Sequence, residues 1–352
     1  MSTKIRIGIS QGDLNGIGLE VILKTFSDPA MEELCTPVLF SSQKTLSFHR
    51  KALGIEESNF HVIKELDQIN PKKPNLMSHY EEDVAIDLGK ASAVAGKYAL
   101  LSLNAACEAI LNQKLDVLVT GPINKHTMAS EGFPFKGHTE YLDRKLGKGA
   151  GDALMIMVSD ELRIALVTGH VAVNEITPLI TADRVMHRLK TFNHSLLQDF
   201  GIRKPRIAVL GLNPHAGDLG TIGKEDVTII TPTIQKAFQE GIMAFGPYPA
   251  DGFFGSGNYK NFDGVLAMYH DQGLVPFKAL SFNNGVNFTA GIPVVRTSPD
   301  HGTAYDLAGK NQASEASFRQ AIYLAIDIFR KRNEYKGLVA NPLKITALRK
   351  EQ

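Results

Sequence analysis

The chain has 352 residues, of which 43% are hydrophobic and 21% charged, and its 38 basic residues nearly balance 37 acidic ones. This length suits about two domains of roughly 150 residues each. A formal net charge of +1 excludes the strong positive field expected of a protein that binds nucleic acid or an anionic membrane.

The composition also predicts a soluble protein of a reducing compartment. The amino terminus MSTKIRIGIS lacks the long apolar core of a signal peptide, and no apolar run approaches the roughly 20 residues needed to cross a bilayer. Only Cys35 and Cys107 occur, and neither lies in a CxxC pair. We therefore expect a cytoplasmic protein without a membrane partner.

Short β-branched runs alternate with longer helical patterns, which is typical of parallel strands joined by crossover helices. Residues 4–10 predict the first strand, and the glycine-rich residues 12–20 follow it and open a helix. Further strands are expected at 115–121, 162–169, 205–212 and 262–269, and a long helix rich in alanine and leucine at 89–113. The pattern indicates an α/β fold.

Two segments fall outside this alternation. Residues 70–90 contain two prolines and mixed charges, which predicts a surface excursion or an insertion. The basic cluster RKRNEYK at 330–336 follows a helical pattern, and we interpret it as a solvated helix end, where cations suit the helix dipole.

Three predicted strands end in a histidine: His170 follows ALVTG, His215 follows AVLGLNP, and His270 follows VLAMY. Ligands bind beyond the carboxyl ends of parallel strands, so these imidazoles can converge on one catalytic divalent metal site. Each can instead be a separate hydrogen-bonded loop histidine. Asp271 and Asp251 can orient ligands, balance charge or act as bases, and each fits a turn or helix cap equally well.

Two further groups offer contacts to a small polar substrate. His138 and Thr139 stand together in GHTEYL, although Thr139 can also simply cap a helix. Lys278, Asn287 and Arg296 supply an ammonium, an amide and a guanidinium that suit a phosphate or carboxylate, with ordinary surface charge as the alternative.

The glycine-rich stretch GDLNGIGLE offers a phosphate-cradling turn, with Gly12, Asp13 and Gly16 as candidate cofactor-binding residues. It does not match G-x-G-x-x-G, so a standard Rossmann fingerprint is not supported.

Along nearly its whole length the chain resembles the 4-hydroxythreonine-4-phosphate dehydrogenase family of vitamin B6 synthesis. The resemblance rests on GDLNGIGLEV, LVTGPINK, FKGHTEYL, LVTGHV, LNPHAGD, YPADGFF, AMYHDQGL and GVNFTAGIPVVRTSPDHGTAYDLAGK. It implies a two-domain α/β/α fold, similar to the isopropylmalate dehydrogenases, with the active cleft between the domains. The implied first domain is 1–143 plus 295–352, and the second is 144–294.

The resemblance also implies the composition of the site. His170, His215 and His270 hold a divalent metal (zinc, magnesium or cobalt), with ligands contributed across the interface of a homodimer. The substrate is contacted by His138, Thr139, Lys278, Asn287 and Arg296, and the catalytic residues are Asp251, Asp271 and Lys278.

A further similarity, to isopropylmalate and isocitrate dehydrogenases, makes residues 300–310 an adenosine-binding loop. His301, Gly302 and Thr303 then contact the cofactor. Asp306 takes the position of an acidic residue that accepts from the ribose hydroxyl and repels a 2′-phosphate, which predicts NAD over NADP. A plain loop aspartate is the alternative.

The implied reaction is the oxidation and decarboxylation of 4-phosphohydroxy-L-threonine to 3-amino-2-oxopropyl phosphate in pyridoxal phosphate biosynthesis. The same site also suits a related phosphorylated four-carbon acid, phosphothreonate or phosphoerythronate. Three metal-binding histidines also fit an aldolase or a hydrolase, and a binding protein without chemistry is a further alternative.

Overall fold

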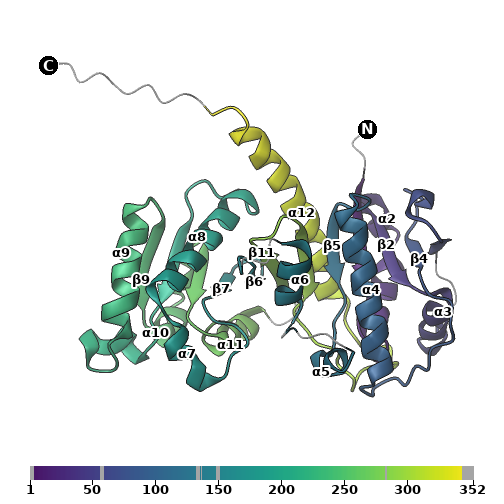
Figure 1. Ribbon diagram of the computed structural model, residues 1–352, viewed down its shortest axis with the longest axis horizontal. Helices are drawn as coiled ribbons and strands as arrows, with labels where there is room; N and C mark the ends of the chain where they lie inside the picture. Colours follow the sequence, from purple (N-terminus) through teal and green to yellow (C-terminus); the bar gives the residue numbers. More distant parts are fainter. Residues whose placement is uncertain are drawn as a thin grey trace.

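Twelve strands form one sheet with helices on both faces (Figure 1). The computed structural model describes residues 4–55, 59–131, 135, 137–147, 151–281 and 284–342. The strand order is β3-β4-β2-β1-β5-β12-β11-β6-β7-β10-β8-β9. This three-layer α/β/α arrangement confirms the predicted fold class.

One half of the sheet is built from both ends of the chain. Its strands are β1 (Ile5–Ser10), β2 (Cys35–Ser41), β3 (His61–Ile63), β4 (Asn75–Ser78), β5 (Val117–Thr120) and β12 (Val295–Pro299). Its helices are α1 (Gly18–Phe26), α2 (Ala30–Leu34), α3 (Gln43–Ala52), α4 (Ala93–Leu111), α5 (Lys125–Ala129), α6 (His138–Leu146) and α12 (Ala316–Val339). All pairings within this half are parallel.

The other half comes from the middle of the chain. Its strands are β6 (Leu154–Val158), β7 (Arg163–Leu166), β8 (Arg206–Leu210), β9 (Met243–Tyr248), β10 (Gly264–Ala267) and β11 (Val286–Ala290). Its helices are α7 (Val173–Leu179), α8 (Ala182–Gln198), α9 (Thr231–Gln239), α10 (Ala250–Gly255) and α11 (His270–Ser281). The strands thus follow the predicted domain division, but the two groups share one continuous sheet, and the division itself stays a prediction.

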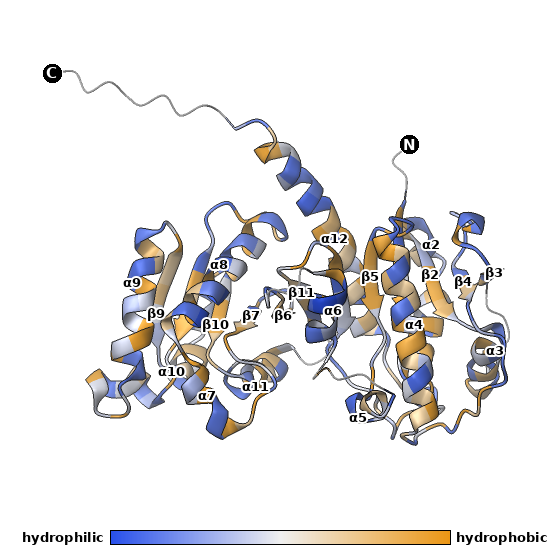
Figure 2. Cartoon of the chain, in the orientation of Figure 1, coloured by the Kyte–Doolittle hydropathy of each residue, from blue (hydrophilic) through white to orange (hydrophobic). Residues whose placement is uncertain are grey.

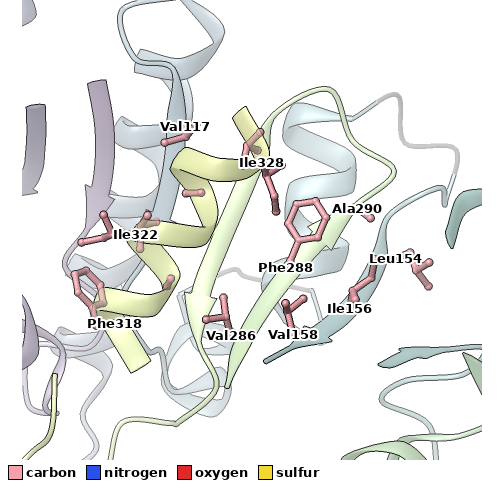
Figure 3. Packing of buried hydrophobic residues seen from close by; sticks show 14 of the residues in the cluster. Val117, Leu154, Ile156, Val158, Val286, Phe288, Ala290, Phe318, Ile322 and Ile328 are labelled. Atoms are coloured by element: carbon pink, nitrogen blue, oxygen red, sulfur yellow. The ribbon is translucent and has the colours of Figure 1, made fainter. Parts of the chain in front are cut away.

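The centre of the sheet is antiparallel, which the expectation of parallel strands missed. β11 pairs antiparallel with both β12 and β6, and β6 pairs antiparallel with β7. Side chains alternate between the faces of these strands. Phe288 and Ile156 belong to the same packed cluster as Ile328 of α12 on one face (Figure 3). Met157, Asn287 and other alternate residues point to the opposite face, which carries the cavity described below.

Two sequence predictions were wrong in detail. Residues Asn75–Ser78, inside the predicted excursion, form β4, which pairs with both β2 and β3. The basic cluster 330–336 lies in the last turns of α12, where most of its residues are exposed as predicted, but Arg332 is not. Arg332 is 6% exposed and pairs with the buried Asp199, so this part of the helix is anchored as well as solvated. The C-terminal part of α12 is mostly hydrophilic (Figure 2).

One described helix, α4, is long and apolar enough to cross a membrane by length and composition, contrary to the expectation from the sequence. α4 has 19 residues and a mean hydropathy of 1.2 over its most apolar window. However, 56% of that window is buried, and the helix packs against β1, β2 and β5. These contacts are those of a core helix in an α/β protein.

Candidate active site

A cavity of about 400 Å³ lies on the sheet face between the start of α6 and α11. Its floor is formed by β6, β11 and β12, and the backbone after β5 forms one wall. Ten of the predicted site residues line it: His138, Thr139, His170, His270, Asp271, Lys278, Asn287, Arg296, His301 and Gly302. The structure therefore brings together residues from distant parts of the sequence.

Arg296 forms the buried floor of this cavity. Its side chain is 1% exposed, and its guanidinium donates to the hydroxyls of Thr120 (2.6 and 3.1 Å) and Thr289 (3.1 Å). It forms no ion pair with a carboxylate of the described residues. Burial without a counter-charge lowers the pKa of Arg296 to about 9. A buried unpaired cation is costly, so the charge on this floor favours an anionic group over a neutral one.

Three other lining residues carry buried polar atoms without hydrogen-bond partners among the described residues: His138 Nε2, Asn287 Oδ1 and His301 Nε2. Burial, together with the positive charges of Arg296 and Lys125, holds the pKa of His138 well below its usual value. The imidazole is therefore neutral near neutral pH. Such atoms are rare in folded proteins unless a ligand or water satisfies them, so a polar ligand is expected here.

His170 and His270 meet at the cavity wall, with ring centroids 5.7 Å apart. They come together because β7 and β10 are neighbouring parallel strands that end at the same edge. His270 Nδ1 lies 2.7 Å from Asp271 Oδ1, and His170 Nδ1 lies 3.7 Å from Glu140 Oε1. These carboxylates can fix the orientation of the rings.

His215 and Asp251 do not line the cavity. β8 pairs with β10 as the prediction requires, but the backbone then turns left-handed from His215 to Leu219, with a φ of 53° at His215. His215 is exposed on this turn, and Asp251 is exposed in the first turn of α10. Among the described residues no group of three His, Cys, Asp or Glu side chains is arranged to hold a metal ion. Of the three predicted metal-binding histidines, the structure brings His170 and His270 together and leaves His215 apart from them.

The glycine-rich loop lies beneath the predicted cofactor loop. Residues 10–23 are buried, and the amides of Asp13, Asn15, Gly16 and Ile17 already donate within the protein. A Cβ at Gly16 would lie 2.7 Å from the Thr303 carbonyl oxygen, so only glycine allows this close approach. Asp13 and Gly16 therefore contact residues 300–310, whereas Gly12 packs against the backbone of Gly121 and Pro122. Their part in cofactor binding stays a prediction.

Tyr305 joins this loop to the cavity wall. Its hydroxyl donates to Asp13 Oδ2 at 2.8 Å and accepts from Asn124 Nδ2 at 3.1 Å. Burial raises the pKa of Asp13, although the hydrogen bonds from Asn15 and Tyr305 oppose this rise. Asp306, on the same loop, is exposed and free to meet a ligand from solvent.

Sequence reasoning missed Lys125, Glu140 and Asp300, which stand close to the predicted residues. Lys125 and Asp300 line the cavity. Burial raises the pKa of Asp300, while nearby Lys278 and Ser317 oppose the rise. Lys125 Nζ lies 3.1 Å from His170 Nε2. The motif GPINK, which contains Lys125, was a signal for this residue, but the sequence alone did not give it a partner.

Comparisons with known proteins agree with this fold. The family model described as "Pyridoxal phosphate biosynthetic protein PdxA" matches residues 33–325. A 4-hydroxythreonine-4-phosphate dehydrogenase of Bacteroides thetaiotaomicron is 54% identical over 97% of this chain and 93% of its own.

Two other relatives extend the comparison. A Cutibacterium acnes protein, assigned provisionally as a D-threonate 4-phosphate dehydrogenase, is 34% identical over 92% of this chain and 94% of its own. The crystal structure of 4-hydroxythreonine-4-phosphate dehydrogenase from Klebsiella pneumoniae superposes with a TM-score of 0.79, at 30% identity, covering 93% of this chain and 98% of that one. The chain therefore belongs to the pyridoxal phosphate biosynthetic protein PdxA family, a family of dehydrogenases.

Proposed function

We propose that this protein oxidises 4-phosphohydroxy-L-threonine with NAD and decarboxylates the product to 3-amino-2-oxopropyl phosphate, in the synthesis of pyridoxal phosphate. The observation that carries this proposal is the buried, unpaired Arg296 on the floor of a polar cavity. Such a site suits a small substrate with anionic groups, and relatives of the chain bear the name of this activity.

The four-carbon substrate has anionic groups at both ends. We assign Arg296 and Lys278 to hold them, because both cations line the cavity. Asn287 Oδ1 is a buried acceptor and suits the amino or hydroxyl group of the substrate. His138 and Thr139, in the first turn of α6, position the chain between these contacts. Thr139 lies one residue inside the helix, so it is not the helix cap, which is Gly137.

Oxidation at the hydroxyl-bearing carbon gives a β-keto acid, which loses carbon dioxide to leave an enolate. When bound, NAD supplies the hydride acceptor for this step. We assign Asp271 to accept the proton of the hydroxyl group, because its carboxylate lines the cavity and hydrogen-bonds His270. We assign Lys278, which lies near Asp300 and lines the cavity, to protonate the enolate.

The metal proposal needs a second copy of the chain. His170 and His270 lie together in one chain, whereas His215 and Asp251 are exposed outside the cavity. We infer that a homodimer completes the ligand set and that His215 of one copy joins the histidine pair of the other. A divalent ion held there would stabilise negative charge on the substrate oxygen. We propose zinc, magnesium or cobalt as this ion.

For the cofactor, the exposed Asp306 and the loop residues His301, Gly302 and Thr303 support NAD binding beside the cavity. His301 and Gly302 line the cavity itself. The buried free thiols Cys35 and Cys107 support a cytoplasmic location. Burial raises the pKa of each thiol to about 12, so both are unreactive at neutral pH.

The direct test measures NADH by its near-ultraviolet absorbance, with purified protein, NAD, a divalent metal and 4-phosphohydroxy-L-threonine. Phosphothreonate and phosphoerythronate are assayed in parallel. Turnover of the amino acid alone is the expected result. Turnover confined to the sugar acids would contradict the substrate assignment but retain the oxidation chemistry.

Phosphothreonate is the second candidate because of the Cutibacterium acnes relative. It carries a hydroxyl where 4-phosphohydroxy-L-threonine carries an amino group, and Asn287 Oδ1 can accept from either. The ratio of kcat/KM for the two substrates decides between them.

A further inference from the structure

Lys125 belongs to the GPINK segment that leads from β5 into α5, and none of the site assignments above uses it. Asn124 fixes the start of this helix, because its Oδ1 accepts from the amides of His126 (2.9 Å) and Thr127 (3.3 Å). Tyr305 fixes Asn124 from the other side. The backbone of Lys125 is therefore held at the cavity wall, while its side chain remains exposed to the cavity.

The Lys125 ammonium lies in a crowded part of this wall. Its Nζ contacts His170 Nε2 at 3.1 Å. A Cβ built on Gly137 would lie 3.6 Å from Lys125 Cε and 3.7 Å from His170 Cε1. Gly137 lines the same cavity, and a Cβ there would be in ordinary van der Waals contact with both side chains.

Lys125 and Arg296 act on the same neighbour. All three side chains line the same cavity, and both positive charges disfavour protonation of His138. Glu140 attracts Lys125 electrostatically, but its carboxylate contacts His170 Nδ1 and forms no ion pair with Lys125 in the described part of the chain. Lys278 stands in the same relation to Asp300, again without an ion pair among the described residues. Neither Lys125 nor Arg296 forms an ion pair with a carboxylate of the described residues, so both positive charges remain available to an anionic ligand.

We propose that Lys125 is a substrate-binding residue, which together with Arg296 forms one anion-binding site around His138. The proposal rests on the proposed function for the identity of the substrate, whose phosphate or carboxylate would occupy this site. A flexible ammonium and a fixed guanidinium together suit either group, since both present several acceptor oxygens.

The test compares the wild type with Lys125→Met and Lys125→Arg by calorimetry, without NAD. Inorganic phosphate serves as the probe for the phosphate group, and 4-hydroxy-L-threonine, which lacks a phosphate, as the probe for the carboxylate. Loss of one charged hydrogen bond corresponds to about a tenfold weaker Kd or more. We expect that loss in Lys125→Met for one of the two probes, with most of the affinity restored in Lys125→Arg. The probe that is affected identifies the group bound.

Lys72→Met is the matched control, because Lys72 is exposed and lies outside the cavity. It should bind both probes like the wild type. Unchanged Kd values for both probes in Lys125→Met would overturn the proposal. So would a change in divalent metal affinity alone, since that result would make Lys125 a residue that only positions His170.

The binding measurement involves no turnover, so it separates this proposal from the proposed function. A protein that oxidises none of the three substrates but shows the Lys125 dependence would retain the anion site and lose the assigned reaction. An active enzyme whose affinity for both probes does not change in Lys125→Met would retain the assigned reaction and lose the anion site.

Discussion

Arg296 donates from both Nε and Nη2 to the single hydroxyl of Thr120, so a fully buried guanidinium is held by neutral groups. Folding alone gains little from such a charge, because its desolvation is not offset by a carboxylate. Function and stability should therefore respond differently when the charge is removed.

We predict that Arg296→Met lowers kcat/KM by about 100-fold or more, since charged hydrogen bonds to the substrate are lost. The free energy of unfolding without ligand should stay the same or rise. Steady-state kinetics and urea unfolding measure the two effects. Arg203→Met, at an exposed position, is the control. A parallel loss of stability and activity would instead make Arg296 a structural residue.

A shared metal site predicts a specific pattern of complementation between inactive variants. If His170 and His270 act from one chain and His215 from its partner, a mixed dimer of His170→Ala and His215→Ala contains one intact site. Random mixing should then restore up to about a quarter of wild-type activity, because half of the dimers are mixed and each has one of two sites.

The control for this experiment is the mixture of His170→Ala with His270→Ala, which should stay inactive because both changes affect the same half of each site. Subunits are mixed by co-expression, and NADH formation is measured with added metal. Activity in the control mixture, together with no activity in the first mixture, would mean that each site takes His170 from one subunit and His270 from the other.

Parts of the site could be predicted because they depend on strand order alone. His170 and His270 follow two β-branched runs, which became adjacent parallel strands, so their meeting required no further information. The position of His215 could not be predicted in this way. It depends on a left-handed turn of five residues, and the sequence NPHAGDLG does not distinguish that turn from an ordinary loop.

Longer-range partners explain the other differences between prediction and structure. Arg332 looked like a solvated helix residue because its partner Asp199 lies far away in the sequence. Asn75 looked like part of a loop, yet its side chain is buried and donates to the Pro37 carbonyl of the neighbouring strand. The absence of a carboxylate beside Arg296 among the described residues likewise depends on the folded structure, because it is set by side chains far away in the sequence.

Replacement of Asp306 by lysine should shift the cofactor preference towards NADP. The residue is exposed on the loop beside the cavity, and a cation there would attract the 2′-phosphate that a carboxylate repels. We expect the ratio of kcat/KM for NADP to that for NAD to rise by about tenfold or more. Asp327→Lys, exposed on α12, controls for the change in net charge. An unchanged ratio in Asp306→Lys would remove this residue from the cofactor site.

His49 should make the stability of the protein depend on pH. It is buried in α3 and hydrogen-bonds the backbone of Leu14, and burial lowers its pKa from 6.5 to about 4. As pH falls below 6.5, the unfolded chain takes up this proton first, so the free energy of unfolding decreases until the folded state is also protonated near 4. Between about pH 7 and about pH 5 the loss should approach about 2 kcal/mol.

Urea unfolding at both pH values should show a smaller loss in His49→Gln than in the wild type, while His194→Gln, at an exposed position, retains the full loss. Equal losses in His49→Gln and the wild type would mean that His49 does not titrate differently in the folded and unfolded states.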